Sequence, residues 1–77
     1  SKEKEYLFYL NNLEGAQRNR LLGITDIHYE DKVEAKRWYR NIAQYIHPDK
    51  SKDSNANKAF NILHGIYKIM IDEDDDK

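Results

Sequence analysis

One proline limits where this chain can be helical. Pro48, the single proline among the 77 residues, stands between two segments with helical periodicity, a basic one at 29–46 and an apolar one at 55–71. Proline lacks the backbone N–H that a helix interior needs, and its ring pushes the preceding residue, His47, out of the α region. The chain is therefore predicted to turn at His47-Pro48-Asp49 and to place this tripeptide in a loop between two helices, where functional residues are often found.

Residues 29–46 have the clearest helical pattern. At about 100° per residue, one side of this helix is broadly apolar and the other carries a basic stripe. The apolar side comprises Ala35, Trp38, Tyr39, Ile42, Tyr45 and Ile46, and the stripe comprises Lys32, Lys36 and Arg40, flanked by Arg37. Few acidic residues stand at pairing distance on the basic side, so the stripe is predicted to be available to a partner. The alternative is a solvated face that keeps a small domain soluble.

Three more helical segments are expected: 2–13, a short one at 16–22 that ends at Gly23, and 55–71. The inward stripes comprise Tyr6, Tyr9, Leu10 and Leu13 in the first helix and Ala59, Phe60, Leu63, Ile66, Tyr67 and Met70 in the last. The last stripe is widened by Ile62, Ile69 and Ile71 beyond what one helix covers. The N-terminal helix is therefore expected to cover its second flank.

The connecting segments carry weaker signals. Ile24 and Ile27 are expected to anchor the segment after Gly23, and His28 to be an ordinary polar loop residue. Asp53 is the expected N-cap of the last helix, because a carboxylate there accepts from the free N–H groups of the first turn.

The amino-acid composition excludes several kinds of site and argues against several classes of protein. The absence of cysteine excludes disulfides and thiolate zinc sites, and it fits a reducing compartment such as the cytoplasm without identifying a location. With 13 basic and 14 acidic residues, the net charge of −1 argues against a nucleic-acid-binding domain. No apolar run approaches the about 18 residues of a membrane span, so no membrane contact is expected of this segment. No cofactor or metal is expected either, and we expect a monomer.

In their order along the chain, these residues resemble the J domain of the DnaJ (heat-shock protein 40 class) co-chaperones. The end of the family's first helix and its Leu-Gly-Val turn are matched by Leu21-Leu22-Gly23-Ile24. The Tyr-(Arg/Lys)-x-Leu-Ala core of its second helix is matched by Tyr39-Arg40-Asn41-Ile42-Ala43, and its signature loop by His47-Pro48-Asp49-Lys50. The apolar positions of its third helix are occupied by Phe60, Leu63, Tyr67 and Met70.

The resemblance implies an all-α fold: a J-domain-like antiparallel helical hairpin with a short preceding helix and an extra N-terminal helix. It divides the chain into an N-terminal helix packed on the domain (1–15), the J domain (16–71) and an acidic tail (72–77). The tail is expected to be solvated, because carboxylates at a helix C-terminus oppose the helix dipole.

J domains bind DnaK-type (Hsp70 family) chaperones and stimulate their ATP hydrolysis, and they are not enzymes themselves. The resemblance therefore implies a partner-binding site, with no catalytic or metal-binding residue. Its residues are Lys36, Arg37 and Arg40 on the basic face and His47, Pro48, Asp49 and Lys50 in the loop. Basic residues steer encounter with an acidic partner, and a proline-stiffened loop loses little entropy on binding.

The chain also departs from the family. Asn41 stands where a second basic residue is common, one that can pair with the signature aspartate, and Trp38 and Ile46 replace a small residue and a tyrosine. The family's fourth helix is replaced by the acidic tail. These departures keep open a second interpretation, a diverged J-like interaction module without ATPase stimulation.

A hydrolytic site is a further alternative. It would pair His47 and Asp49 with Ser51 or Ser54, but no oxyanion-hole motif or glycine elbow accompanies them. A binding loop is therefore the better interpretation.

Overall fold

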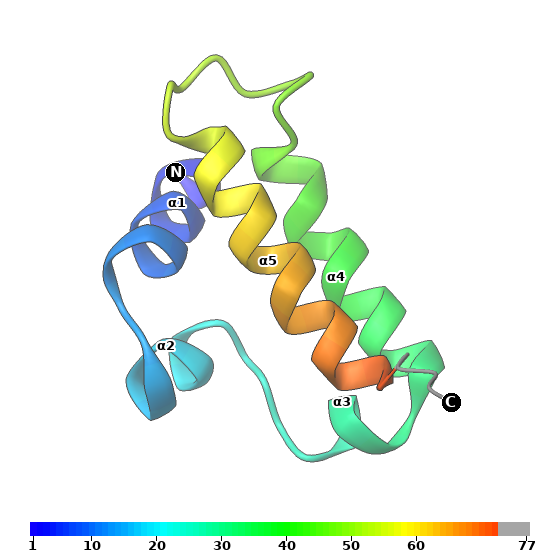
Figure 1. The fold of residues 1–77 in the computed structure, drawn as a ribbon. Helices are drawn as coiled ribbons and strands as arrows, with labels where there is room; N and C mark the ends of the chain where they lie inside the picture. The colour runs from blue at the N-terminus through cyan, green and yellow to red at the C-terminus, as the bar shows by residue number, and fades with distance from the viewer. Residues whose placement is uncertain (73–77) are drawn as a thin grey trace.

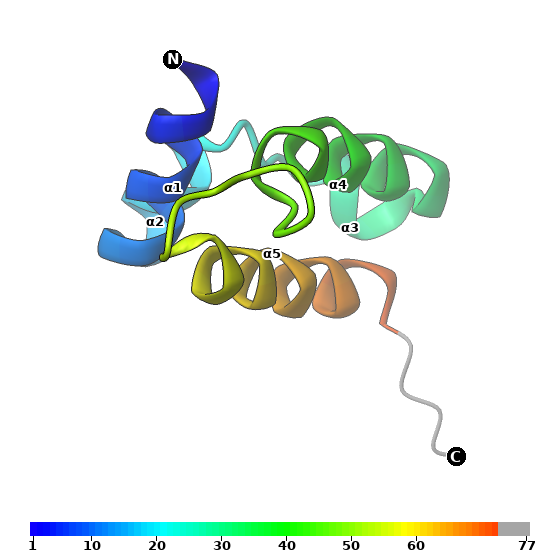
Figure 2. The ribbon, with the colours of Figure 1, turned by 90° about the horizontal axis from the view of Figure 1, so that it is seen from above.

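Five helices and no strand make up residues 1–72, the part of the chain that this computed structural model describes (Figure 1). They are α1 (Lys2–Asn12), α2 (Gly15–Leu21), α3 (Ile27–Glu30), α4 (Lys32–Ile46) and α5 (Ala56–Ile71). Helices α4 and α5 lie side by side in opposite directions, and α1 lies beside both at the end where the loop joins them (Figure 2). The predicted all-α hairpin with a short preceding helix and an N-terminal helix is confirmed.

The limits of the described chain bear on two predictions. Of the expected acidic tail, only Asp72 is described, and it ends α5 in the left-handed conformation, with φ of 48°. The rest of the tail, 73–77, lies outside the described residues. The domain boundary at residue 15 stays a prediction. Among residues 1–72, no helix combines the length and the apolar character needed to cross a membrane.

A single hydrophobic core joins α1, α4 and α5 with the segment that follows α2. Its four most completely buried large side chains come from three helices: Leu10, Ile42, Ile46 and Leu63. The other buried members are Leu7, Leu22, Ala35, Trp38, Ala56, Ala59, Ile66 and Met70. The hairpin is thus completed by an N-terminal helix that contributes to the same core.

The inward side of α1 differs from the predicted stripe. Leu7 and Leu10 are buried, whereas Tyr6 and Tyr9 are only half-buried against the core. The burial of Leu7 was not predicted, and the two tyrosines are less deeply buried than predicted. A tyrosine at the edge of a contact buries its ring and leaves its hydroxyl in water, so apolar spacing alone does not show which side chains go deepest.

Two isoleucines predicted to pack inward are exposed instead: Ile27, expected to anchor the segment after Gly23, and Ile69, expected to widen the inward stripe of the last helix. Ile69 is 70% exposed and Ile27 is 44% exposed, while Ile24 packs against the core as expected. Helix α1 lies near the start of α5, so it does not cover the later turns where Ile69 lies (Figure 1). The prediction that the N-terminal helix covers the whole widened flank of α5 was wrong for this position.

The helix predicted over 29–46 begins at Lys32. Asp31 is extended, with φ of −129°, and its carboxylate accepts from the N–H groups of Val33 at 2.9 Å and Glu34 at 3.3 Å. This side-chain cap starts α4 and separates it from the single turn of α3. Residues 29 and 30 therefore belong to a different element, although they continue the helical periodicity.

The predicted cap of α5 is displaced by two residues. The N-cap is Asn55, and the carboxylate of Asp53, two residues earlier, accepts from the Asn55 N–H at 2.8 Å. The carboxylate of Asp53 thus closes the loop before the helix instead of capping the helix itself.

The chain between α2 and α4 is fixed by one buried hydrogen bond. After Gly23 turns the backbone with φ of 74°, as predicted, the indole N–H of Trp38 donates to the Leu22 carbonyl at 2.8 Å. Next to it, His28 accepts from the Thr25 N–H at 3.0 Å, and its ring centroid lies 6.2 Å from that of Trp38. His28 therefore has a structural role that its prediction as an ordinary loop residue did not include.

We expect Trp38→Phe to lower the free energy of unfolding by about 2–4 kcal/mol. The change leaves the buried Leu22 carbonyl without its donor and removes part of a core side chain. Urea unfolding followed by far-UV circular dichroism measures the loss, and Tyr29→Phe, on an exposed aromatic residue of α3, is the matched control. A loss under about 0.5 kcal/mol in Trp38→Phe contradicts the importance of this hydrogen bond.

Candidate partner-binding site

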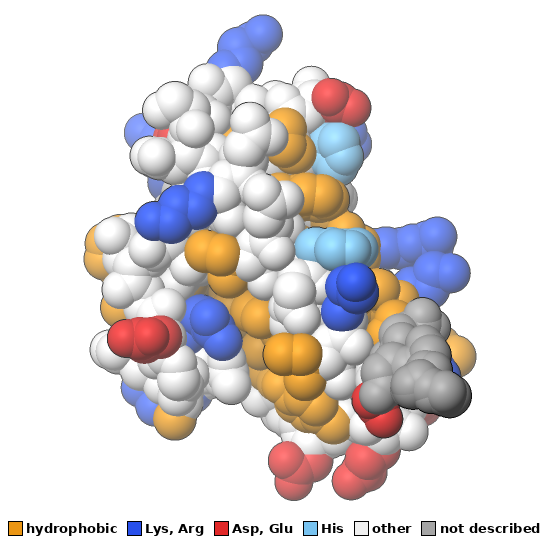
Figure 3. Space-filling model, viewed as in Figure 1, with side chains coloured by type: hydrophobic (Ala, Val, Ile, Leu, Met, Phe, Trp, Pro, Cys, Tyr) orange, Lys and Arg blue, Asp and Glu red, His pale blue; other side chains and the backbone are white. Residues whose placement is uncertain are grey.

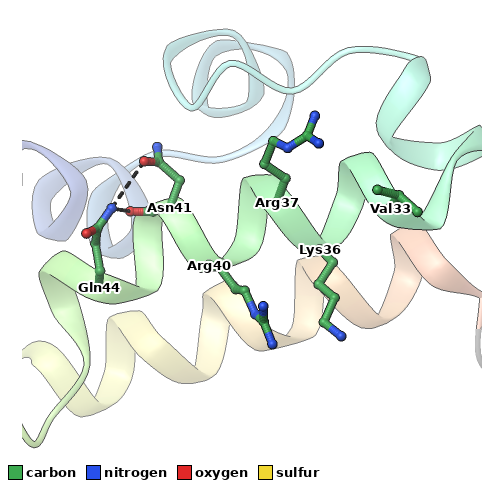
Figure 4. A pocket seen from close by; sticks show the side chains of 6 residues that line it. All are labelled: Val33, Lys36, Arg37, Arg40, Asn41 and Gln44. Atoms are coloured by element: carbon green, nitrogen blue, oxygen red, sulfur yellow. Dashed lines mark hydrogen bonds between the residues drawn. The ribbon is translucent and has the colours of Figure 1, made fainter.

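The predicted basic residues lie on the exposed side of α4. Lys36, Arg37 and Arg40 line a shallow open depression together with Val33, Asn41 and Gln44 (Figure 4). Figure 4 also shows that Lys36 and Arg40 point toward the α5 side of the helix and Arg37 toward the opposite side. The basic stripe is thus divided into a pair and a single arginine.

Arg37 was predicted to be available to a partner, but it already forms an ion pair. Its guanidinium lies 2.7 Å from the Glu34 carboxylate, one turn earlier on α4. The Arg37 side chain is 70% exposed, so water screens this ion pair and a stronger acidic partner can replace Glu34. Within residues 1–72, neither Lys36 nor Arg40 makes an ion pair, so these two are more available for binding than Arg37.

The turn after α4 is held by its own backbone. His47 leaves the helix at φ −58° and ψ 133°, the extended conformation that a following proline favours. Its carbonyl accepts from the N–H groups of Lys50 at 2.8 Å and Ser51 at 2.9 Å. Pro48 and these two bonds fix the backbone of the turn that carries His47, Asp49 and Lys50.

The His47 ring is oriented by two contacts. Its Nδ1 accepts from the Asp49 N–H at 3.1 Å, and the ring lies edge-on to Phe60 of α5, with centroids 4.9 Å apart. Because Nδ1 is an acceptor here, the neutral ring carries its hydrogen on Nε2. The side chain is 42% exposed, so Nε2–H is the donor that His47 offers to a partner.

Asp49 is the most exposed of the signature residues. Its side chain is 90% exposed, and its one ionisable neighbour within 4.0 Å among residues 1–72 is His47, at 3.7 Å from Nδ1 to Oδ2. Asn41 does not hold it: the Gln44 amide donates to the Asn41 backbone oxygen at 3.0 Å and to its Oδ1 at 3.2 Å (Figure 4). The Asp49 carboxylate therefore points into solvent, where a cationic partner group can reach it.

The helix geometry brings the two parts of the predicted site together. Residues seven or eleven apart lie on the same side of an α-helix, so Lys36, Arg40 and His47 fall in one row along α4. Arg40 precedes His47 by about two turns, or about 10 Å along the axis. The basic pair and the loop thus form one continuous surface.

An aromatic cluster supports this surface from the α5 side. The Tyr39 ring stacks on Tyr67, with centroids 4.5 Å apart, and lies 6.2 Å from Phe60 and 6.0 Å from His64. Burial, and to a lesser extent the neighbouring Tyr67, raise the pKa of the Tyr39 phenol above its ordinary 10.0. Figure 3 shows histidine, lysine or arginine and hydrophobic side chains together on this side of the molecule.

Sequence reasoning missed two supports of the loop. Phe60 was placed in the apolar stripe of α5, but its contact with His47 was not foreseen. Ser51 is 7% exposed, and its hydroxyl donates to the Glu3 carboxylate of α1. Glu3 precedes Ser51 by 48 residues, and no local pattern indicates such a pair. Within residues 1–72, no group of three or more acidic or histidine side chains is placed to hold a metal ion.

Comparison with known proteins gives two matches in sequence. The family model of the DnaJ domain matches residues 20–77. A curated relative, the chaperone protein DnaJ of Gloeobacter violaceus, is 40% identical over 43 residues, which cover 56% of this chain and 11% of that protein. The chain therefore spans about a tenth of the length of this relative. No solved structure gave a significant match.

The raised pKa of Tyr39 predicts a pH dependence of stability. Because the folded chain holds the phenol proton more tightly than the unfolded chain, this stabilisation is complete below pH 10.0 and is lost as the pH rises through the folded pKa. In Tyr39→Phe the free energy of unfolding should therefore fall less steeply above pH 10.0 than in the original chain. Urea unfolding at neutral pH and along an alkaline series measures both slopes, and equal slopes contradict the prediction.

Proposed function

Because this chain belongs to the DnaJ domain family, we propose that it binds a DnaK-type (Hsp70 family) chaperone and stimulates its ATP hydrolysis. The observation that carries the proposal is the unaltered His47-Pro48-Asp49 loop, with its histidine braced by Phe60, at the end of the Lys36–Arg40 row. The co-chaperone class follows from the family. The partner and the residues that contact it are the proposal.

Binding would begin at the basic pair. Lys36 and Arg40 attract an acidic surface of the chaperone, raise the association rate and make it sensitive to salt. Arg37 joins them by exchanging Glu34 for a carboxylate of the partner, a small cost because the existing pair is exposed.

The loop would then make the specific contacts. His47 offers Nε2–H, Asp49 offers an exposed carboxylate, and Lys50 adds a third polar side chain at the same turn. Since Pro48 and the backbone bonds to His47 already fix this arrangement, little conformational entropy is lost on binding. The proposal assigns no catalytic residue to this chain: the hydrolysed ATP and the groups that cleave it belong to the chaperone.

One observation favours a second candidate, a diverged interaction module that binds without stimulating hydrolysis. Asn41 bonds with Gln44 and leaves Asp49 exposed and without a basic neighbour on α4 in the described chain. An aspartate held less firmly could still contribute to binding while failing to orient the chaperone for hydrolysis. The following experiment separates the two candidates.

Single-turnover ATP hydrolysis by a DnaK-type chaperone, with and without this chain, tests the loop. We expect stimulation by the original chain and its loss, by tenfold or more, in both His47→Gln and Asp49→Asn, because each variant removes a group that the partner contacts (~1.4 kcal/mol per tenfold). Far-UV circular dichroism should show unchanged helical content in both. Binding of the folded original chain without any stimulation would instead support the interaction module.

The basic pair is tested by the chain concentration that gives half-maximal stimulation. We expect Arg40→Ala and Lys36→Ala each to raise it roughly fivefold at low salt, with a smaller effect at high salt, as for the loss of one charge pair. Lys58→Ala is the matched control, because Lys58 is an exposed lysine of α5 beside α1, away from the proposed face. An equal effect of all three variants would show that only total charge matters.

A further inference from the structure

Helix α1 touches the signature loop through Glu3. The Ser51 hydroxyl donates to the Glu3 carboxylate, and the Asp53 N–H donates to the same hydroxyl at 3.3 Å. Ser51 is the one buried polar residue among residues 1–72. The Glu3 carboxylate thus holds the Ser51 side chain, which in turn holds the backbone of Asp53 in the second half of the loop.

A second contact lies two turns further along α1. The Asn11 amide donates to the Asn55 carbonyl at 3.2 Å, at the point where the loop enters α5. Glu3, Leu7 and Asn11 follow each other at four-residue spacing, so they lie on one side of α1. Since Leu7 is buried in the core, it sets the rotation of the helix that presents both polar residues to the loop.

A third contact reaches the other end of the loop. The Tyr6 ring of α1 packs on Tyr45 in the last turn of α4, with centroids 5.8 Å apart. Helix α1 therefore contacts the chain before the loop, inside it and after it. Glu3, Tyr6 and Asn11 all lie outside residues 20–77, the part matched by the DnaJ domain family.

We propose that α1 holds the 47–55 loop in its partner-binding conformation, and that Glu3 is the principal positioning residue, acting through Ser51. The structural half of this inference stands on the contacts alone, whereas its effect on a chaperone rests on the proposed function. Glu3 itself need not touch the partner.

The physical basis is a shift between two loop states. Without an acceptor at Glu3, the buried Ser51 hydroxyl loses its hydrogen bond, and open conformations of the loop become more populated. A partner that binds the ordered loop then has an apparent affinity reduced by the fraction of ordered loop. The maximal stimulation is unchanged, because saturating partner restores the order.

Amide hydrogen exchange of the complete chain tests the structural half. We expect Glu3→Ala and Ser51→Ala each to speed exchange of the Lys50, Ser51 and Asp53 amides about tenfold, and the double variant to exchange no faster than the single ones. Glu3→Gln, whose amide oxygen still accepts from the hydroxyl, should stay near the original rate.

Two controls separate positioning from general stability. Glu5→Ala changes an exposed carboxylate of α1 whose side chain makes no hydrogen bond within residues 1–72, and it should leave the loop amides unchanged. The Leu63 amide in the middle of α5 reports global opening. Trp38→Phe, which destabilises the fold away from the loop, should speed exchange of this amide and leave the loop amides unchanged. Unchanged loop exchange in Glu3→Ala, additive effects of the two substitutions, or acceleration of the loop amides in Trp38→Phe would each overturn the proposal.

The chaperone assay adds a readout of function. In Glu3→Ala the half-saturating concentration should rise up to about tenfold at an unchanged maximal rate, and Glu3→Gln should restore it. If the original chain stimulates no chaperone, the proposed function fails, while the exchange data still decide whether α1 orders the loop. If stimulation is normal and equal in Glu3→Ala and the original chain, α1 has no positioning role.

Discussion

The packing of α4 against α5 is the interaction on which the rest of the structure depends. Ile42 and Ile46 meet Leu63 in an interior that excludes water almost completely. In a pair of helices, each helix is covered on one side only, so a pair of this length leaves much apolar surface exposed to water. Helix α1 covers that surface near the loop, and the hydrogen bond from Trp38 to Leu22 draws the intervening segment over the other end. The surface proposed to bind a partner is the side of the pair that neither covers.

The hairpin could be predicted because two strong local signals agree. Helical periodicity on both sides of Pro48 and the turn forced by the proline depend only on neighbouring residues. The ends of the helices were harder to predict, because a cap such as Asp31 starts a new helix even where the helical periodicity continues through it. The exposure of Ile69 could not be predicted from the sequence, because it depends on how far α1 extends along α5. Apolar spacing identifies a side of a helix, and the lengths of its neighbours decide how much of that side is buried.

The candidate site was predictable to a similar degree. The residues of the basic face and of the loop follow from spacing and from the resemblance, and helical spacing puts Lys36, Arg40 and the C-cap His47 in one row. The pairing of Arg37 with Glu34 was visible at three-residue spacing and was overlooked. The contacts that orient the loop were hidden, because Phe60 and Glu3 reach it from other helices. Local sequence thus indicated the groups proposed to contact a partner and missed those that hold them in place.

The distance along the chain between α1 and the loop also determines when the loop can become ordered. The α4–α5 pair closes through a short connection, whereas Glu3 and Asn11 find their partners 48 and 44 residues later. Contacts between distant residues form later in folding than local ones, because closing the longer loop costs more entropy. During synthesis, α1 leaves the ribosome before α5 and can dock only after α5 has been made. Order in the loop is therefore the final feature to form, and fraying at the start of α1 is a route by which it is lost while the helical pair remains intact.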